Sequence, residues 1–243
     1  MKKYHFESVS STNDKARELL EKDNIVFVSA DFQSKGRGRN NKSWEGNPSD
    51  NIYFSAGITK PELLNPERIP FYQAIGTLAA MHAISDLTKS KIFRMKYPND
   101  IMVKCKDGKS RKICGVLSEN CFLGNVCTYA IVGIGVNVNQ EVFEKELEDE
   151  AISLKNLGFA VQTDELLKLI EKYLEELIKL NDKAIHNIWQ SELKIEGKSI
   201  SIVGNEKSWI ADSLLADGRL QVISPENLEQ RIIDNGDSIE YDY

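Results

Sequence analysis

The stretch from Gly36 to Trp44 narrows the possible folds of this chain more than any other segment. It follows directly on the run Ile25–Ala30, whose β-branched and aromatic residues predict a buried strand. A glycine-rich loop after a strand indicates a dinucleotide-binding fold only when the loop opens a helix. Residues 45–51 are turn-forming and cannot be the first turns of a helix, so the Rossmann arrangement is excluded.

The loop itself predicts a site for a small anionic molecule. It combines two glycines, three cationic side chains and one indole: Gly36, Arg37, Gly38, Arg39, Lys42 and Trp44. Glycine has no Cβ, so backbone N–H groups can approach a ligand closely, and arginine forks match carboxylate or phosphate oxygens. A basic surface loop is the alternative when this pattern is taken alone.

Charge and composition limit the class of protein. The 243 residues carry 31 basic and 37 acidic side chains, a net charge of −6, which argues against general affinity for nucleic acid or anionic membranes. The length allows one substantial domain and a small second one. No run approaches the roughly 20 apolar residues that cross a bilayer, and the start lacks the apolar run of a signal peptide, so a cytoplasmic location is expected. The spacing of the four cysteines does not favour a zinc site.

Hydrophobic periodicity predicts a mixture of strands and helices. Strands are expected at residues 3–9, 25–30, 51–58, 92–97, 101–105, 112–122 and 126–138. Helices are expected from residues 11 or 12 to 22, from residue 70 onward, and from a cap at Thr163 to near Trp189. Residues 141–150 hold six acids and predict a solvated loop or helix start. After residue 195, five short strands separated by turns suggest a small barrel.

Four further segments carry polar or glycine residues at positions suited to a ligand. They are Ser10–Asn13 at a helix start, Lys96–Ile101 with its Pro-Asn-Asp turn, Arg111–Glu119 at the start of a strand, and Val132–Asn139 within another. Taken singly, the first two read as a helix cap and a hairpin turn. Glycines within a strand weaken it unless something must approach closely there.

In this order and spacing, the segments resemble the catalytic domain of biotin protein ligases, also called biotin–[acetyl-CoA-carboxylase] ligases. The match runs motif by motif over about residues 8–140. It implies an α/β (α+β) fold, with a mixed sheet flanked by helices as in class II synthetase-like biotin/lipoate ligase domains, then an SH3-like β-barrel. The expected domains are residues 1–190 and 195–243.

The resemblance also implies a two-step reaction with ATP and Mg²⁺. The carboxylate of biotin attacks the α-phosphate of ATP to give biotinyl-5′-AMP, and a lysine of a biotin carboxyl carrier domain then takes up the biotinyl group. Bringing two anions together requires cations in the site.

Residue by residue, the resemblance implies the following roles. Catalytic groups would be Lys112, Arg37 and Arg39. Biotin would be bound by Ser11, Thr12, Asn13, Gln33, Gly36, Arg37, Gly38, Arg39, Lys112 and Gly115. ATP and the adenylate would be bound by Arg39, Lys42, Trp44, Lys96, Asn99, Asp100 and Asn137, and Asp100 would also hold Mg²⁺.

The chain departs from the usual family pattern at two positions. Lys42 stands where an arginine is common, which keeps the charge but loses the bidentate fork. Tyr97 stands where a tryptophan is usual. The Ser11–Asn13 motif begins so early that no DNA-binding module fits before it, so an enzyme-only form without nucleic acid as a partner is expected.

Two alternatives to biotin ligation stay open at this level. A lipoate ligase would share the fold, and a biotin-binding sensor would share the pocket but turn nothing over. The Gly-Arg-Gly-Arg loop favours biotin, and Lys112 together with both arginines favours an enzyme. The family includes monomers and dimers, so a homodimer is also open.

Overall fold

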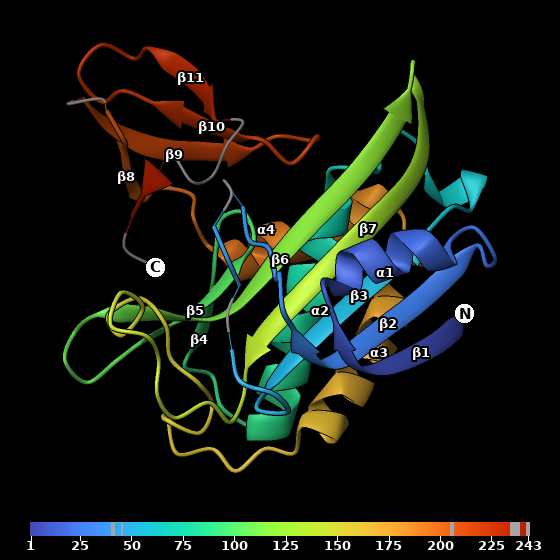
Figure 1. Cartoon of the computed structure of the whole chain (residues 1–243). Coiled ribbons are helices and arrows are strands. Elements are labelled where there is room, and N and C mark those ends of the chain that lie inside the picture. Colours follow the sequence, from blue (N-terminus) through green and yellow to red (C-terminus); the bar gives the residue numbers. More distant parts are fainter. Residues whose placement is uncertain (40–41, 45, 205–206, 234–238, 242–243) are drawn as a thin grey trace.

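The computed structural model contains a large and a small β-sheet (Figure 1). It describes residues 1–39, 42–44, 46–204, 207–233 and 239–241. The large sheet is built from β1 (Lys2–Val9), β2 (Ile25–Gln33), β3 (Asn51–Ile58), β4 (Phe93–Lys96), β5 (Asp100–Lys104), β6 (Ser110–Leu123) and β7 (Val126–Asn137). Its strand order is β1-β2-β3-β7-β6-β5-β4. Strands β1 and β2 pair in parallel and the other neighbours are antiparallel, which confirms the predicted mixed sheet.

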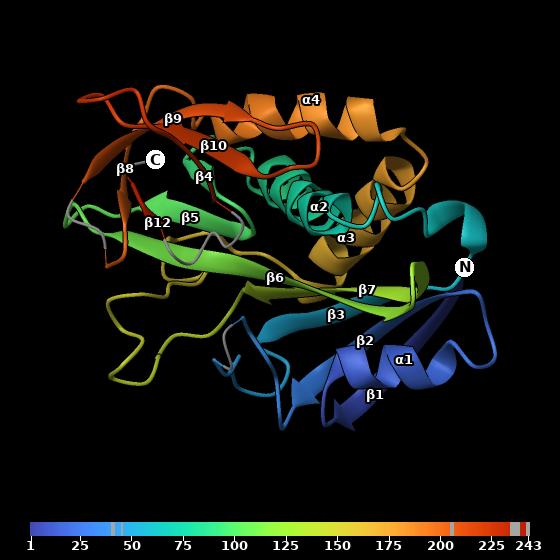
Figure 2. The same ribbon diagram turned by 90° about the horizontal axis from the view of Figure 1, so that it is seen from above.

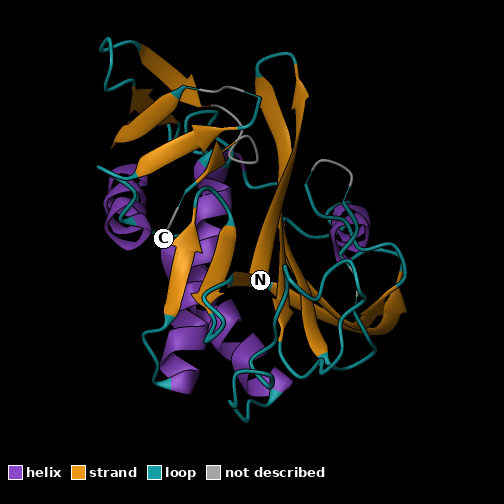
Figure 3. Cartoon of the chain, turned by 90° about the vertical axis from the view of Figure 1, so that its left-hand side faces the viewer, coloured by secondary structure: helices purple, strands orange, loops and turns teal. Residues whose placement is uncertain are grey.

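Helices cover both faces of the large sheet (Figures 2 and 3). Helix α1 (Thr12–Leu19) packs Ala16 and Leu19 on one face, against Val26, Val28 and Ile131. Helices α2 (Phe71–Thr88) and α3 (Thr163–Leu177) lie on the other face, over the main hydrophobic core. Strand β3 therefore buries all eight of its residues, although its sequence alternates between apolar and smaller or polar side chains.

The predicted helix from Thr163 to near Trp189 is wrong, because two helices occupy this region. After α3 ends, the Asn181 side chain caps α4 (Asp182–Leu193) by accepting the Ala184 N–H at 2.9 Å. Asparagine side chains compete with helical backbone bonds and favour caps. The buried Arg68 guanidinium then donates to the carbonyls of Ile178 and Leu180 at the corner between the helices. The residue expected as the first cap, Thr163, is instead the first residue of α3.

The small sheet is antiparallel and fits the SH3-like barrel expected for the C-terminal region. Its strands are β8 (Ser199–Ile202), β9 (Ser208–Leu214), β10 (Leu220–Ile223), β11 (Gln230–Ile233) and β12 (Ile239–Glu240), in the order β11-β10-β9-β8-β12. This sheet lies beside α4 (Figure 2). The domain boundary at residues 190–195 stays a prediction. Among the described residues, no helix is both long enough and apolar enough to span a bilayer.

Candidate active site

A cavity of about 540 Å³ lies where the glycine-arginine loop, the start of α1 and strands β6 and β7 meet. Every residue that the sequence analysis assigned to the site lines it, except Gly36. They come from the start of α1 (Ser11, Thr12, Asn13), the end of β2 (Gln33), the loop (Arg37, Gly38, Arg39, Lys42, Trp44), the end of β4 and the β4–β5 turn (Lys96, Asn99, Asp100), and strands β6 and β7 (Lys112, Gly115, Asn137). The fold thus brings five separate segments to one cavity, while the roles of their residues toward a ligand stay predictions.

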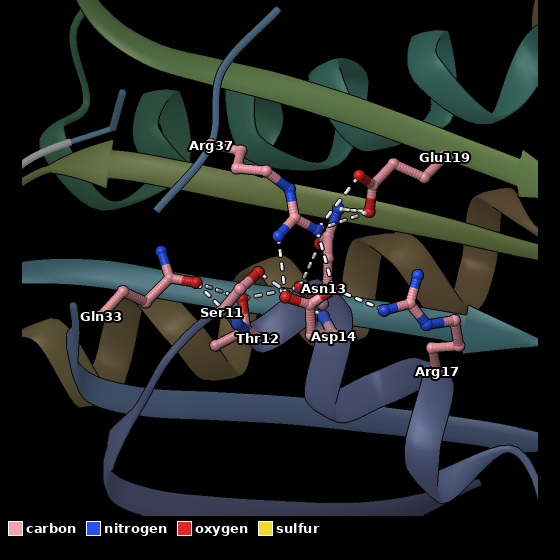
Figure 4. A network of polar contacts seen from close by, with 9 residues as sticks. Ser11, Thr12, Asn13, Asp14, Arg17, Gln33, Arg37 and Glu119 are labelled. Atoms are coloured by element: carbon pink, nitrogen blue, oxygen red, sulfur yellow. Dashed lines mark hydrogen bonds and ion pairs between the residues drawn. The ribbon is translucent and has the colours of Figure 1, made fainter. Parts of the chain in front are cut away.

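At one end of the cavity, neutral side chains form a hydrogen-bonded set, which lies beside the ion pairs of Arg37 (Figure 4). The backbone N–H and the hydroxyl of Thr12 donate to Gln33 Oε1 at 2.6 and 3.0 Å. Behind them, the buried Ser55 hydroxyl lies 2.7 Å from Thr12 Oγ1 and 2.6 Å from Asn13 Oδ1. Sequence reasoning missed Ser55, because nothing in the apolar strand β3 marks it as a partner of α1.

The Arg37 side chain ties the loop to α1 and β6 (Figure 4). Its guanidinium donates to both carboxylate oxygens of Asp14, at 2.7 and 2.9 Å, and to Glu119 at 3.2 and 3.3 Å. Glu119 also accepts from Asn13 Nδ2 at 2.8 Å. The hydrogen bonds from Arg37 lower the pKa of Asp14 below its ordinary value. Neither carboxylate was predicted from the sequence, because their pairing with Arg37 depends on how a helix and a strand lie in space.

The loop closes on itself as a narrow hairpin. The Gly38 N–H donates to the Lys42 carbonyl at 2.7 Å, and the Trp44 N–H donates to the Gly36 carbonyl at 3.0 Å. A Cβ on Gly36 would lie 2.3 Å from the Trp44 carbonyl oxygen. Gly36 is therefore required by the fold of the loop, and it does not line the cavity.

The glycines of β6 and β7 allow close approach, as predicted, and here the approaching groups belong to the chain itself. A Cβ on Gly135 would lie 2.3 Å from Trp44 Cε2, and one on Gly115 would lie 2.9 Å from Trp44 Cζ3. A Cβ on Gly133 would lie 2.4 Å from Asn13 Oδ1. The Trp44 indole thus lies flat on this part of the sheet, with its buried Nε1 lacking a hydrogen-bond partner among the described residues.

Replacing Gly135 with alanine is expected to displace the Trp44 indole, because the added methyl group would overlap it. The fluorescence emission of Trp44 should shift to longer wavelength, and its quenching by acrylamide should increase. The Trp44 signal is obtained by subtracting the spectrum of the double variant Gly135→Ala, Trp44→Phe from that of Gly135→Ala, and it is compared with the same difference in the unaltered background. Gly38→Ala is the control, since its Cβ would come no nearer than 3.5 Å to Lys42 O. Unchanged Trp44 emission in Gly135→Ala would contradict this packing.

The other end of the cavity carries charged groups. Lys112 Nζ lies 2.7 Å from Asp100 Oδ2. Arg39 Nη1 donates to Asn99 Oδ1 at 3.2 Å, and Asn99 Nδ2 in turn donates to the Val116 carbonyl at 2.7 Å. The loop, the β4–β5 turn and β6 are therefore joined through side chains at this end.

A β-bulge explains how Lys112 and Gly115 share the cavity. Three positions apart in a regular strand, they would face opposite sides of the sheet. In the pairing of β5 with β6, however, Asp100 lies opposite Gly115 and Met102 lies opposite Lys112, with a register shift between them. The extra residue turns Lys112 to the face that Gly115 occupies.

The acidic segment 141–150, expected as a solvated loop or helix start, contributes to the cavity wall. The Lys112 N–H donates to the Glu150 carbonyl at 2.7 Å, and the Ile152 N–H donates to the Lys112 carbonyl at 3.0 Å. Phe143 and Leu147, both partly buried, line the cavity. The signal available in the sequence was their spacing of four among exposed acids, which is typical of one apolar face. Ile239 and Glu240 of β12 also line the cavity and carried no such signal.

Asn137 lies in the same wall, at the end of β7. Its Nδ2 approaches the carbonyls of Lys112 and Ile152 at 3.5 and 3.4 Å. The amide is buried and held between two backbone segments, so its position is set by the fold.

Comparison with known proteins identifies the family. The sequence profile of the Biotin/lipoate A/B protein ligase family matches residues 5–137, more than half of the chain. The chain belongs to this family. The match includes the α1 start, the loop, the β4–β5 turn and the glycines of β6 and β7.

The sequence of the chain is moderately similar to those of individual relatives. It is 28% identical over 194 residues to the bifunctional ligase/repressor BirA of Bacillus spizizenii, covering 75% of the chain and 57% of BirA. It is 29% identical over 146 residues to the biotin–[acetyl-CoA-carboxylase] ligase of Mycobacterium tuberculosis, covering 57% of the chain and 47% of that protein. The chain thus matches about half the length of these relatives.

The structure closely matches a solved member of the family over its whole length. The biotin protein ligase from Aquifex aeolicus in complex with biotin and ATP superposes with a TM-score of 0.76 at 25% identity, covering 99% of this chain and 98% of that chain. The superposition covers 99% of this chain, so it extends over the C-terminal sheet.

Proposed function

We propose that the chain is an ATP-dependent ligase that activates biotin as biotinyl-5′-AMP and transfers it to a lysine of a biotin carboxyl carrier domain. The observation that carries the proposal is one cavity with two chemically different ends. Neutral donors and acceptors around Thr12 and Gln33 suit the uncharged ureido head of biotin, and the charged end at Lys112 suits its carboxylate. The volume of about 540 Å³ lies within the usual range for small-molecule sites.

Adenylation needs positive charge at the reacting atoms. A carboxylate oxygen of biotin attacks the α-phosphorus of ATP, a new P–O bond forms, and the bond to the β-phosphate oxygen breaks so that pyrophosphate leaves with its electron pair. The approaching groups are both anions, so fixed cations lower the barrier most where charge accumulates. Lys112, Arg39 and Lys42 line the cavity and supply that charge, with Lys112 bridging the carboxylate and the α-phosphate.

Arg37 has a different part in this proposal. Its guanidinium is held by Asp14 and Glu119, so its side chain fixes the loop in place. The backbone around Gly38 then closes over the acyl chain and carboxylate of biotin. Trp44 covers the adenylate, and Asn137 reads the adenine ring.

Magnesium fits the site as an ion held largely by phosphate. Among the residues that the structure describes, no group of three or more His, Cys, Asp or Glu side chains could hold a metal alone. Mg²⁺ in nucleotide sites is commonly bound by one or two carboxylates together with phosphate oxygens. Asp100 is the proposed carboxylate, and the ion would neutralise phosphate charge when bound.

In the second step, the amine of the acceptor lysine attacks the acyl carbon of the mixed anhydride. An amide bond forms, the bond to the phosphate oxygen breaks, and AMP leaves while the amine loses a proton. The names of the relatives support a carboxylase subunit as acceptor, and the solved Aquifex ligase supports biotin and ATP as substrates. A homodimer is compatible with this chemistry, and all residues proposed to act in the reaction come from one chain.

Two measurements test the proposal against its alternatives. Titration calorimetry should show binding of biotin and little binding of lipoate. A lipoate ligase would show the opposite preference. Addition of biotin to the protein with Mg-ATP should release pyrophosphate, which a biotin sensor without turnover would not do. Biotin binding without pyrophosphate release would contradict the proposed activity.

A further inference from the structure

The turn between β4 and β5 carries Asn99 and Asp100 into the charged end of the cavity. Asn99 accepts from Arg39, and Asp100 pairs with Lys112. The position of this turn therefore determines where two polar groups meet the loop and β6. Only three residues separate the end of β4 at Lys96 from the start of β5 at Asp100, so small movements of either end reach both side chains.

Tyr97, the first residue of the turn, contacts residues of α4 and of the C-terminal sheet region. Its side chain is buried, with the ring stacked on Trp189 of α4 at a centroid distance of 5.8 Å and an interplanar angle of 20°. Its hydroxyl donates to the Gly218 carbonyl, in the turn before β10, at 3.1 Å. Gly218 has a φ of +82°, and a Cβ there would lie 3.0 Å from Trp189, so the backbone can come this close only as glycine.

Tyr241 holds the same residue from a second direction. Its hydroxyl accepts the backbone N–H of Tyr97 at 2.6 Å. Tyr241 directly follows β12, whose residues Ile239 and Glu240 line the cavity. The C-terminal region thus makes two hydrogen bonds to Tyr97. One joins the Tyr97 side chain to the Gly218 carbonyl, and the other joins the Tyr97 backbone to the Tyr241 side chain.

Neither bond is needed for the two elements merely to pack together. The Tyr97 ring would stack on Trp189 without its hydroxyl, and Trp209, Ala211 and Val222 of the small sheet belong to the same hydrophobic core as Trp189. A hydrogen bond between buried groups fixes direction, and leaving one partner without the other is costly. Both bonds therefore set the orientation of the turn relative to the C-terminal sheet.

We propose that Tyr97 and Tyr241 are positioning residues, through which the C-terminal sheet fixes the Asn99–Asp100 turn for binding of the nucleoside triphosphate. The proposal rests on the proposed function, in which Asp100 meets the phosphates of ATP through Mg²⁺. The neutral end around Thr12 and Gln33 makes none of these contacts. Biotin binding in the absence of nucleotide should therefore be independent of both tyrosines.

The test compares Tyr97→Phe and Tyr241→Phe with the unaltered chain. Each substitution removes one hydroxyl and keeps the ring. The KM for ATP in pyrophosphate release should rise about tenfold, while the dissociation constant for biotin, measured by calorimetry without nucleotide, stays within twofold. Tyr173→Phe is the matched control, since it removes a hydroxyl that bonds to Asp86 between α2 and α3, remote from the cavity.

The outcomes separate the two proposals. An ATP KM within twofold of the unaltered chain in both variants would overturn the positioning role. So would equal weakening of ATP and biotin binding with a lowered melting temperature, because that pattern indicates a general loss of structure. A rise of the ATP KM in Tyr173→Phe to the same extent would also overturn it. Failure of the unaltered chain to release pyrophosphate would instead contradict the proposed function.

Discussion

Replacing Lys112 with alanine is expected to lower the rate of biotin-dependent pyrophosphate release by about 100- to 1,000-fold, as for loss of a fixed group that stabilises transition-state charge. The ammonium group lies 2.7 Å from Asp100 and faces the cavity, where the carboxylate of biotin would meet the α-phosphate. Removing it leaves two anions to approach each other, and leaves the Asp100 carboxylate to repel both. The loss should therefore appear in kcat more than in the dissociation constant for biotin.

The fold should survive this substitution. The backbone N–H and carbonyl of Lys112 bond to Glu150 and Ile152, and neither bond involves the side chain. Lys104→Ala is the control, since Lys104 is an exposed lysine at the end of β5 that does not line the cavity. The measurement is single-turnover pyrophosphate release with saturating biotin and Mg-ATP. A rate for Lys112→Ala within threefold of the unaltered chain would contradict the role of Lys112 in adenylation.

Replacing Arg39 with glycine is expected to release the intermediate. Arg39 lines the cavity and contacts Asn99, so it connects the loop to the turn at the charged end. A guanidinium clamp on phosphate is lost in the variant, while Lys112 stays in place to form the adenylate. Biotinyl-AMP is a reactive anhydride, and once it diffuses away it acylates exposed lysines.

The variant should label serum albumin at least about tenfold more than the unaltered chain does, as expected when the loss of one charge-assisted contact, about 1.5–3 kcal/mol, weakens retention. Labelling is measured by blotting for biotin after incubation with biotin and Mg-ATP, and it should fall as the enzyme is diluted. Lys35→Gly controls for added backbone freedom, because Lys35 is an exposed residue just before the loop that does not line the cavity. Pyrophosphate release by Arg39→Gly without extra labelling of albumin would show that Arg39 does not retain the intermediate.

Much of the fold could be predicted from local patterns, because strand and turn signals depend on neighbouring residues. Strand β3 was predicted with its observed bounds, and the five short C-terminal strands were each found at their predicted places. The break between α3 and α4 was missed because Leu174, Leu177 and Ile185 continue one apolar stripe across it. The cap at Asn181 and the carbonyl contacts of Arg68 decide the break, and the latter come from a residue more than 100 positions away.

The site was predicted to the extent that motifs mark it. The segments around Thr12, Arg39, Asn99 and Lys112 were recognised by residue type and order, and they do line one cavity. What the sequence could not provide was the pairing among them. That Arg37 pairs with Asp14 and Glu119 follows from the packing of α1 on β2, β3 and β7, which brings Asp14 near Glu119 of the neighbouring strand β6, and no spacing rule predicts it.

The most direct test of the proposed ligase activity is mass spectrometry of the small molecules formed when the protein is incubated with biotin and Mg-ATP in the absence of an acceptor. We expect biotinyl-5′-AMP bound to the protein, at up to one molecule per chain, together with pyrophosphate in equal amount. Lys112→Ala should bind biotin and form little adenylate. Biotin recovered unchanged beside intact ATP, from a protein that binds both, would contradict the proposed activity.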